Sequence, residues 1–274
     1  MSSVSVQNQW IESHPYLRNV EEFQQTVTDV FTKLSPPQVS KPEWKTVLDG
    51  YAQGVPLLES VPTELGYSSA AGELLLAGNT ELLNRTLTEA VTASARSLQE
   101  YLLASAENRV TAVEWVQNGE AETAPPAAGL LRVLAWAAIR RTMAPVLKSY
   151  SELRKDEEWM RPYCPVCGAP PALAHLHGAH PRTLACGYCL STWEFRRIGC
   201  PFCDNDDQNQ LSVLTIELEP LFRLDTCRAC NGYLKTYLGT DDLELHLSDW
   251  SSLHLDVLAQ QNNLERKGAS LFEI

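Results

Sequence analysis

The sequence predicts an α plus small β fold class, with an all-helical N-terminal bundle, two small metal-binding modules made of short strands, and a C-terminal helix. Two observations predict this order. Roughly the first 155 residues lack cysteine and carry apolar residues at three- and four-residue intervals, whereas all eight cysteines fall between residues 164 and 230. Helical spacing indicates a core of packed helices, and clustered cysteines indicate a core organised around bound metal.

The N-terminal section is predicted to form several amphipathic helices separated by loops that contain proline. Apolar residues recur at helical spacing in 16–34, in 79–116 as one long or two shorter helices, and in 129–153. A further helix is expected to begin near Ser40, its N-cap, with Pro42 in the first turn. Pro145 predicts a bend in the last helix. The apolar stripes indicate mutual packing in a bundle and not a cofactor site.

The charge distribution argues against a general affinity for nucleic acid or for anionic membranes. The net charge is −12, and residues 161–239 carry seven basic and seven acidic side chains, so the acidic excess lies in the flanks. The most apolar stretch, "PPAAGLLRVLAWAAIRRTMAPVL", contains Arg132, Arg140 and Arg141, which would be costly at bilayer depth. We therefore expect a core helix and no membrane insertion. The first 20 residues lack the pattern of a signal peptide, so a cytoplasmic protein is expected.

The eight cysteines form four C-x-x-C pairs separated by gaps of 18, 10 and 23 residues. A tetrahedral soft cation needs four thiolates at about 2.3 Å, and one C-x-x-C turn supplies two of them. The spacing therefore predicts two tetrathiolate-bound metal ions, each held in a zinc-ribbon module. Both zinc and iron fit this ligand type. The predicted ligands are Cys164, Cys167, Cys186, Cys189, Cys200, Cys203, Cys227 and Cys230.

An internal duplication suggests how the pairs combine. "CPVCG" and "CPFCD" each open a unit that "LACGYC" or "DTCRAC" completes, so the first pair is expected to join the second and the third to join the fourth. The crossed pairings also fit, because spacing does not fix connectivity. Gly168 allows positive φ after the first knuckle. "LSVLTIELEPLFRLDTC" predicts a pair of strands, and an acidic helix is expected to begin near Ser248.

Other roles for the cysteines fit less well. Disulfides are rare in a chain without a secretion signal, and thioredoxin-type redox catalysis would require a βαβ pattern around a C-x-x-C pair. His175, His177 and His180 lie inside the first module and are expected to form a polar loop and not to bind metal. Three aromatic residues follow the second knuckles and are expected to cover the metal sites, with binding of a client protein as the alternative. They are Trp193, Tyr233 and Tyr237.

Several segments together resemble the formate dehydrogenase accessory protein (FdhE) family. They are "YCPVCGAPP", "LACGYCLSTWEFRRIGCPFC", "CRACNGYLKTY" and "SLHLDVLAQQNNLERKGASLF", with "HPYLRNVEEF" as a weaker match near the N-terminus. The resemblance implies an all-helical domain over 1–158, rubredoxin-like zinc-ribbon modules over 159–198 and 199–240, and a C-terminal helix and tail over 241–274. It also implies a cytoplasmic maturation factor that binds the catalytic subunit of formate dehydrogenase before export and is needed for active enzyme.

The resemblance also marks residues beyond the cysteines. "WEFRRIGC" and "GYLK" are similar to recurring family segments, and from them we take as candidate partner contacts Trp193, Arg196, Arg197, Tyr233 and Lys235. The histidine loop at 175–180 matches no family motif.

The sequence favours binding over catalysis. Four sulfur ligands leave no open position on a metal ion, and no serine elbow, phosphate-binding loop or H-E-x-x-H motif is present. We therefore predict an assembly factor that is not an enzyme. Two alternatives remain, an iron-thiolate redox protein acting on the client and a nucleic-acid-binding zinc-ribbon protein. Balanced charge over 161–239 weakens the second, because phosphate binding needs an excess of lysine and arginine. The oligomeric state is left open.

Overall fold

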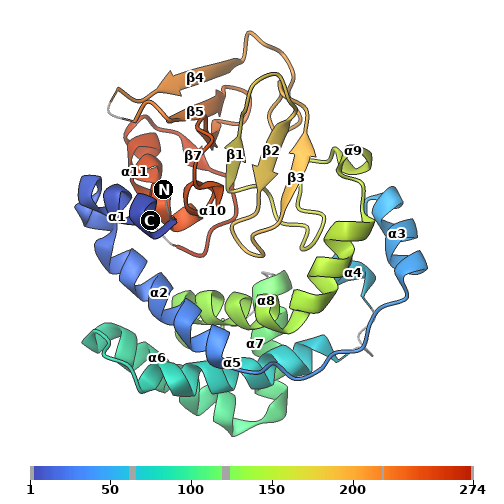
Figure 1. The fold of residues 1–274 in the computed structure, drawn as a ribbon, viewed down its shortest axis with the longest axis vertical. Helices are drawn as coiled ribbons and strands as arrows, with labels where there is room; N and C mark the ends of the chain where they lie inside the picture. The colour runs from blue at the N-terminus through green and yellow to red at the C-terminus, as the bar shows by residue number, and fades with distance from the viewer. Residues whose placement is uncertain (1–2, 62–65, 119–123, 218, 273–274) are drawn as a thin grey trace. The chain divides into compact units, whose positions relative to one another are not determined.

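The computed structural model describes residues 3–61, 66–118, 124–217 and 219–272 (Figure 1). The chain divides into two compact units. One comprises Met1–Glu21, Leu48–Leu58 and Lys155–Ile274, and the other comprises Glu22–Val47 and Glu59–Arg154. In the part of the chain that is described, no helix is both long and apolar enough to cross a bilayer. The predicted module boundaries stay predictions.

The second unit is built around one apolar helix. Its main helices are α2 (Arg18–Lys33, from Glu22 onward), α5 (Tyr67–Leu83), α6 (Glu89–Ala104), α7 (Ala106–Asn118) and α8 (Ala128–Leu153) (Figure 1). Helix α5 packs against α6, α7 and α8. A helix that contacts neighbours on several sides needs apolar residues around most of its circumference. Helix α5 meets this need, because its leucines and small residues are buried along most of its length.

Small and polar residues of α5 set its distance from its neighbours. A Cβ at Gly78 would clash with the ring of Phe31 on α2, so glycine allows the aromatic ring to lie against the α5 backbone. The fully buried Asn79 donates from Nδ2 to the Ala95 carbonyl oxygen at 2.9 Å and to Gln99 Oε1 at 2.7 Å, both on α6. Buried amides need such partners, so this pair of hydrogen bonds fixes how α5 meets α6.

Several predicted helices have shifted boundaries. The helix expected near Ser40 is α3 (Trp44–Gln53), and the region 79–116 contains the end of α5 followed by two separate helices, α6 and α7. Helix α8 continues through Pro145 to Leu153. The short helices are α1 (Ser3–Ser13), the 3-10 turn Pro15–Leu17, α4 (Leu57–Ser60) and α9 (Asp156–Trp159). The prediction that this section is helical is confirmed, although several helices begin or end at other residues than expected.

The first unit contains one seven-stranded sheet. Its strands are β1 (Leu173–His175), β2 (Arg182–Ala185), β3 (Thr192–Phe195), β4 (Leu211–Thr215), β5 (Phe222–Cys227), β6 (Gly232–Tyr237) and β7 (Glu265–Arg266). The strand order is β3-β2-β1-β6-β5-β4, and β7 also pairs with β6. Each predicted module supplies three antiparallel strands, and the predicted strand pair over 211–227 is β4 with β5.

The two modules are joined through their backbones. Strand β1 of the first module pairs in parallel with β6 of the second, with Leu173 opposite Lys235 and His175 opposite Tyr237. A buried arginine strengthens the junction, since Arg182 on β2 donates from Nη2 to the Gly199 carbonyl oxygen at 2.7 Å and places Nη1 3.5 Å from Asp225 Oδ2 on β5. The modules therefore form one continuous sheet and not two separate sheets.

The C-terminal segment packs on this sheet. It forms α10 (Leu243–His246), a 3-10 turn (Asp249–Ser252) and α11 (Leu253–Gln261), so the main helix starts later than the predicted Ser248 (Figure 1). Leu255 and Ala259 of α11 share a buried cluster with Phe222, Tyr233 and Tyr237 of the sheet. The predicted fold class, helical at the N-terminus with a sheet region and a C-terminal helix, is confirmed.

An N-terminal segment of the chain supports the first knuckle from within the same unit. The backbone N–H groups of Leu57 and Leu58 each donate at 2.9 Å, to the carbonyl oxygens of Pro165 and Val166. Tyr51 stacks on Trp159, with ring centroids 4.9 Å apart. Residues 48–58 thus belong to the structure around the first cysteine cluster, although the sequence places them among the helices.

Candidate metal centres

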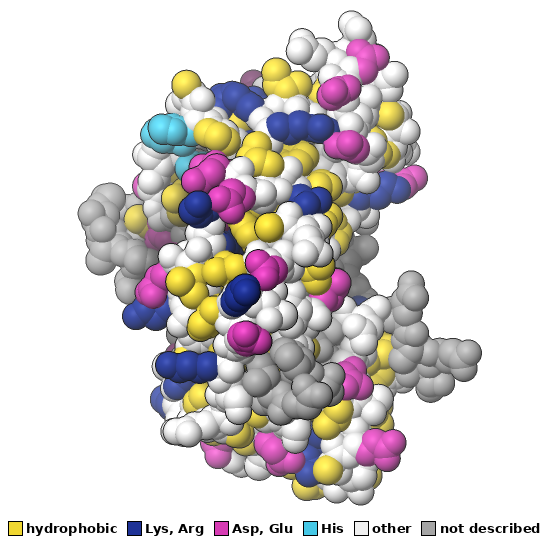
Figure 2. Space-filling model, turned by 90° about the vertical axis from the view of Figure 1, so that its right-hand side faces the viewer, with side chains coloured by type: hydrophobic (Ala, Val, Ile, Leu, Met, Phe, Trp, Pro, Cys, Tyr) yellow, Lys and Arg dark blue, Asp and Glu magenta, His cyan; other side chains and the backbone are white. Residues whose placement is uncertain are grey.

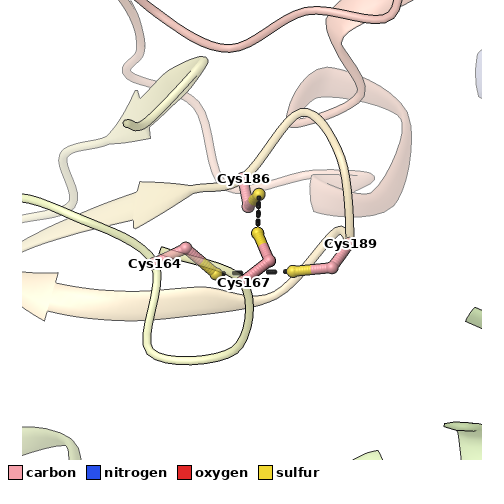
Figure 3. A group of neighbouring side chains, drawn as sticks. All are labelled: Cys164, Cys167, Cys186 and Cys189. Carbon is pink, nitrogen blue, oxygen red and sulfur yellow. Dashed lines mark hydrogen bonds between the residues drawn. The ribbon is translucent and has the colours of Figure 1, made fainter. Parts of the chain in front are cut away.

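Four cysteines of the first module converge between two loops (Figure 3). Cys164 and Cys167 come from the knuckle before β1, and Cys186 and Cys189 from the turn between β2 and β3. Cys164 Sγ lies 3.4 Å from Cys189 Sγ, and Cys167 Sγ lies 3.5 Å from Cys186 Sγ. The other sulfur pairs are all within 4.8 Å.

These distances fit a bound ion better than disulfides. A tetrahedron of sulfurs at about 2.3 Å from a metal has sulfurs about 3.8 Å apart, whereas a disulfide joins them at about 2.05 Å. The shortest contacts in the second cluster are 3.7 Å for Cys200 with Cys230 and 3.7 Å for Cys203 with Cys227. Each cluster could hold one metal ion. The pairing of first knuckle with second and third with fourth is confirmed.

The same backbone conformation shapes all four knuckles. The residue after each second cysteine has positive φ, and these residues are Gly168 (75°), Leu190 (63°), Asp204 (61°) and Asn231 (58°). The left-handed residue closes the turn, as shown by the Gly168 N–H donating to the Cys164 carbonyl oxygen at 2.9 Å. Inside the turn the Val166 N–H points at Cys164 Sγ, at 3.4 Å. Backbone N–H groups aimed at sulfur stabilise thiolates, and the conformation expected at Gly168 is confirmed.

The electrostatics of the first cluster are compatible with a bound cation. Burial raises the pKa of the Cys164 thiol, and hydrogen bonding with Cys164 raises the pKa of Cys167. Burial also opposes ionisation of Cys189, but hydrogen bonds from the other three thiols outweigh it and lower its pKa. The Cys189 thiolate is thus stabilised by hydrogen bonds from the neighbouring thiols. Four buried thiolates together need a positive ion to offset their repulsion.

The second cluster is more accessible than the first. Cys203 is exposed, and Cys200 and Cys227 line a cleft of about 160 Å³ that also contains Arg182 and Arg223. Burial opposes ionisation of Cys227, but N–H groups of the Cys227–Cys230 turn and the Asn205 amide donate to its sulfur and lower its pKa to about 7. The Asn205 Nδ2 lies 3.6 Å from that sulfur.

The candidate partner contacts that follow the second knuckle of the first module differ in exposure. Trp193 is buried and donates from Nε1 to the Arg161 carbonyl oxygen at 2.9 Å. Arg196 is half-buried and donates to Asp204 Oδ1 at 2.6 Å, which places its guanidinium against the third knuckle. Arg197 is exposed and donates to the His180 carbonyl oxygen at 2.8 Å. Their assignment as partner contacts stays a prediction.

Tyr233 and Lys235 lie inside a buried network of charges. Lys235 is 1% exposed, and its Nζ donates at 2.7 Å to both Asp249 Oδ1 and Asp256 Oδ2. The Tyr233 hydroxyl donates to Asp256 Oδ1 at 2.6 Å, and Arg266 Nη2 donates to Asp249 Oδ1 at 2.7 Å. The network connects β6 to the 3-10 turn, α11 and β7. A partner contact by these two side chains also stays a prediction.

The remaining residues singled out in the sequence either contact other parts of the chain or are exposed to solvent. Tyr237 is buried and donates its hydroxyl to Asp241 Oδ1 at 2.8 Å. His175 Nε2 lies 2.8 Å from the Gly239 carbonyl oxygen, and His177 and His180 are exposed. Among the described residues that could hold a metal, these three histidines belong to no group.

One group of possible metal ligands was missed by the sequence reasoning. His14, Glu219 and His254 bring one donor atom each within 4.8 Å of the others. His14 Nε2 and Glu219 Oε1 are in direct contact, and His254 Nε2 lies 3.6 Å from the same oxygen. Burial opposes ionisation of Glu219, but its contacts with both histidines lower its pKa to about 2. Separations of more than 200 residues between His14 and the other two hide this group from any local motif.

Comparisons with known proteins place these features in context. No family model matches the chain. The protein named FdhE homolog from Aquifex aeolicus is 32% identical over 129 residues, which cover 43% of this chain and 45% of that protein. The FdhE homolog from Pseudomonas aeruginosa is 30% identical over 123 residues, covering 40% and 39%. The matched stretches thus span less than half the length of these relatives.

A solved structure matches nearly the whole chain. The crystal structure of the FdhE protein from Pseudomonas aeruginosa covers 96% of this chain and 91% of its own, with a TM-score of 0.65 and 23% identity. The resemblance to the FdhE family predicted from the sequence is confirmed by these comparisons. The chain is similar in sequence to proteins named FdhE homolog and has the fold of the Pseudomonas aeruginosa FdhE protein.

Proposed function

We propose that the protein is an accessory factor for the formation of active formate dehydrogenase. It acts in the cytoplasm, binds the catalytic subunit before that subunit is exported, and catalyses no reaction itself. The observation that carries this proposal is the presence of two four-cysteine clusters on one continuous sheet, in a fold shared with an FdhE protein.

In this proposal the eight cysteines are ligands of two structural ions, zinc or iron. Four sulfurs complete a tetrahedral shell, so substrate has no open position on either ion. Each ion instead joins two loops of one module. Because β1 and β6 connect the modules, both ions stabilise one surface. A stiff surface loses little conformational entropy when a client binds.

The exposed guanidinium of Arg197 is the proposed direct contact with the client, with Arg196 beside it. Trp193, Tyr233 and Lys235 support that role by holding the sheet surface in shape, because their side chains are buried inside the chain.

The surface composition supports a protein client over a nucleic acid. On the face shown in Figure 2, lysine and arginine side chains of the described residues are interspersed with aspartate and glutamate. Phosphate backbones are bound by continuous basic surfaces.

Deletion of the gene tests the accessory role. Formate-dependent dye reduction should be lost while the catalytic polypeptide is still made, and the wild-type gene should restore activity. A Cys164→Ser/Cys167→Ser variant should release one of two ions, measured by mass spectrometry, and should restore little activity. An Arg197→Glu variant should keep both ions yet capture less catalytic subunit in a pull-down. Normal formate oxidation in the deletion strain would refute the proposal.

A redox function is a second candidate, favoured by the accessibility of the second cluster. An iron ion there would lie beside the exposed Cys203, and electron transfer is helped by an exposed ligand. Anaerobically purified protein would then show an iron-thiolate absorption spectrum that bleaches reversibly on reduction. Protein that contains zinc alone in both clusters, and that supports enzyme maturation, excludes this candidate.

A further inference from the structure

Three segments that are distant in sequence meet at the group formed by His14, Glu219 and His254. His14 lies between α1 and the 3-10 turn Pro15–Leu17, Glu219 lies in the connection between β4 and β5, and His254 lies in the first turn of α11. All three belong to the first unit. His14 is 5% exposed, and the side chains of Glu219 and His254 are 14% and 16% exposed. These polar groups are therefore largely removed from water.

The hydrogen bonds of His14 direct one nitrogen toward the carboxylate. Its Nδ1 lies 2.9 Å from the Trp10 carbonyl oxygen, which can only accept, so Nδ1 carries a proton. Trp10 also stacks on the imidazole, with ring centroids 3.8 Å apart, and fixes its orientation. In neutral His14 the Nε2 lone pair then faces Glu219 Oε1. Two acceptors in contact need a positive charge between them, either a proton or a metal ion.

The ring nitrogens of His254 are an independent indication of a bound metal ion. Neither of its ring nitrogens has a hydrogen-bond partner among the described residues, although both are buried, and Nε2 lies 3.6 Å from Glu219 Oε1. Leaving a buried polar atom without a partner costs stability. A metal ion bonded to Nε2 removes that cost. A separation of 3.6 Å also suits two ligands bound to one ion at about 2.0–2.2 Å.

We propose that His14 Nε2, His254 Nε2 and a Glu219 carboxylate oxygen form a third metal site, for a divalent transition ion such as Zn²⁺ or Co²⁺. Two imidazoles and one carboxylate are a donor set that these ions accept, whereas Mg²⁺ and Ca²⁺ prefer oxygen alone. The hydrogen bond from His14 Nδ1 to a backbone carbonyl is the outer-shell contact typical of metal-bound histidine. Three protein ligands leave a position on the ion for water.

The site differs in kind from the two cysteine clusters. Its ligands join the N-terminal segment, the second module and the C-terminal helix, so the ion would fasten three segments of the first unit together. The exposed ring of Tyr16 lies 5.8 Å from the His14 ring and 5.7 Å from the His254 ring. The proposal does not depend on the accessory function.

A cobalt titration tests the site in the full-length protein. The starting protein carries two equivalents of zinc in its cysteine clusters, verified by mass spectrometry, after a weak chelator has removed loosely bound ions. Added Co²⁺ should bind as one further equivalent, with visible ligand-field bands and no sulfur-to-cobalt charge-transfer band. His254→Gln should weaken this binding by more than the ~10–100-fold typical of lost outer-shell contacts. His177→Gln, which removes an exposed histidine outside the group, should bind like wild type.

The outcomes separate clearly. Wild-type protein that takes up no third equivalent overturns the proposal, as does a His254→Gln variant with unchanged cobalt affinity. A charge-transfer band shows cobalt bound to cysteine and also overturns it. If His254→Gln loses its cysteine-bound zinc, Glu219→Gln replaces it. This variant keeps the side-chain shape and should likewise lose the third equivalent while retaining two.

Discussion

Replacement of Lys235 by methionine should destabilise the first unit strongly. The wild-type network contains two cations, the buried Lys235 and the half-buried Arg266. They pair with two carboxylates, Asp249 and Asp256. Methionine fills similar volume but removes one positive charge, which leaves the carboxylates in excess in a site where they are 4% and 1% exposed. Removing one partner of a buried ion pair costs about 3–5 kcal/mol. We expect a loss of that size in the free energy of unfolding.

The assay is urea unfolding at pH 7 of protein loaded with zinc beforehand, followed by intrinsic tryptophan fluorescence and by zinc release. Lys267→Met is the matched control. Lys267 is paired with Glu265, but the lysine side chain is 36% exposed, and surface pairs contribute little to stability. Adding Asp256→Asn to Lys235→Met removes the surplus charge and should recover part of the loss. Equal, small effects of Lys235→Met and Lys267→Met would refute the reasoning.

The remaining predictions concern pH, the second cluster and the helical unit. Burial opposes ionisation of Asp249, but the charges of Lys235 and Arg266 outweigh it and lower its pKa, so its contribution is present above the ordinary pKa of 3.8 and is lost as pH falls through the lowered value. Without Lys235 that carboxylate protonates more readily, and the destabilisation by Lys235→Met should be smaller at pH 5 than at pH 7 in urea unfolding; an effect independent of pH would contradict this. Cys200→Ser with Cys203→Ser should release one ion and leave the other bound, as measured by mass spectrometry, and retention of both would remove these residues from the ligand set. Gly78→Ala should lower the free energy of unfolding by about 1–3 kcal/mol, because the added Cβ overpacks against the Phe31 ring on α2. An unchanged midpoint of thermal or urea unfolding would show that α5 and α2 can move apart without cost.

The sequence predicted the cysteine clusters well because the information is local. Two cysteines three residues apart fix a knuckle, and a repeated unit favours pairing neighbours in the chain. Even so, the left-handed turn was expected only at Gly168, where glycine signals it, and the same conformation at Leu190 carries no such signal. At that position the geometry of the metal knuckle outweighs residue preference.

Other features depend on contacts that no local pattern records. Helix α5 was not predicted to start at Tyr67, because a helix that is apolar on most sides lacks the stripe that reveals an amphipathic one. Lys235 was selected as a motif residue, yet its burial depends on carboxylates that arrive 14 and 21 residues later. His14 and Glu219 meet across 205 residues, and no local pattern connects them.

The parallel pairing of β1 with β6 has a consequence for cells short of metal. Both strands lie in the interior of the sheet only because both modules are folded. If the second module lost its ion and unravelled, β1 would become an edge strand with unpaired N–H and C=O groups. Such an edge is a template for pairing with another chain. If the second module holds an ion as proposed, loss of that ion would therefore expose a starting point for aggregation.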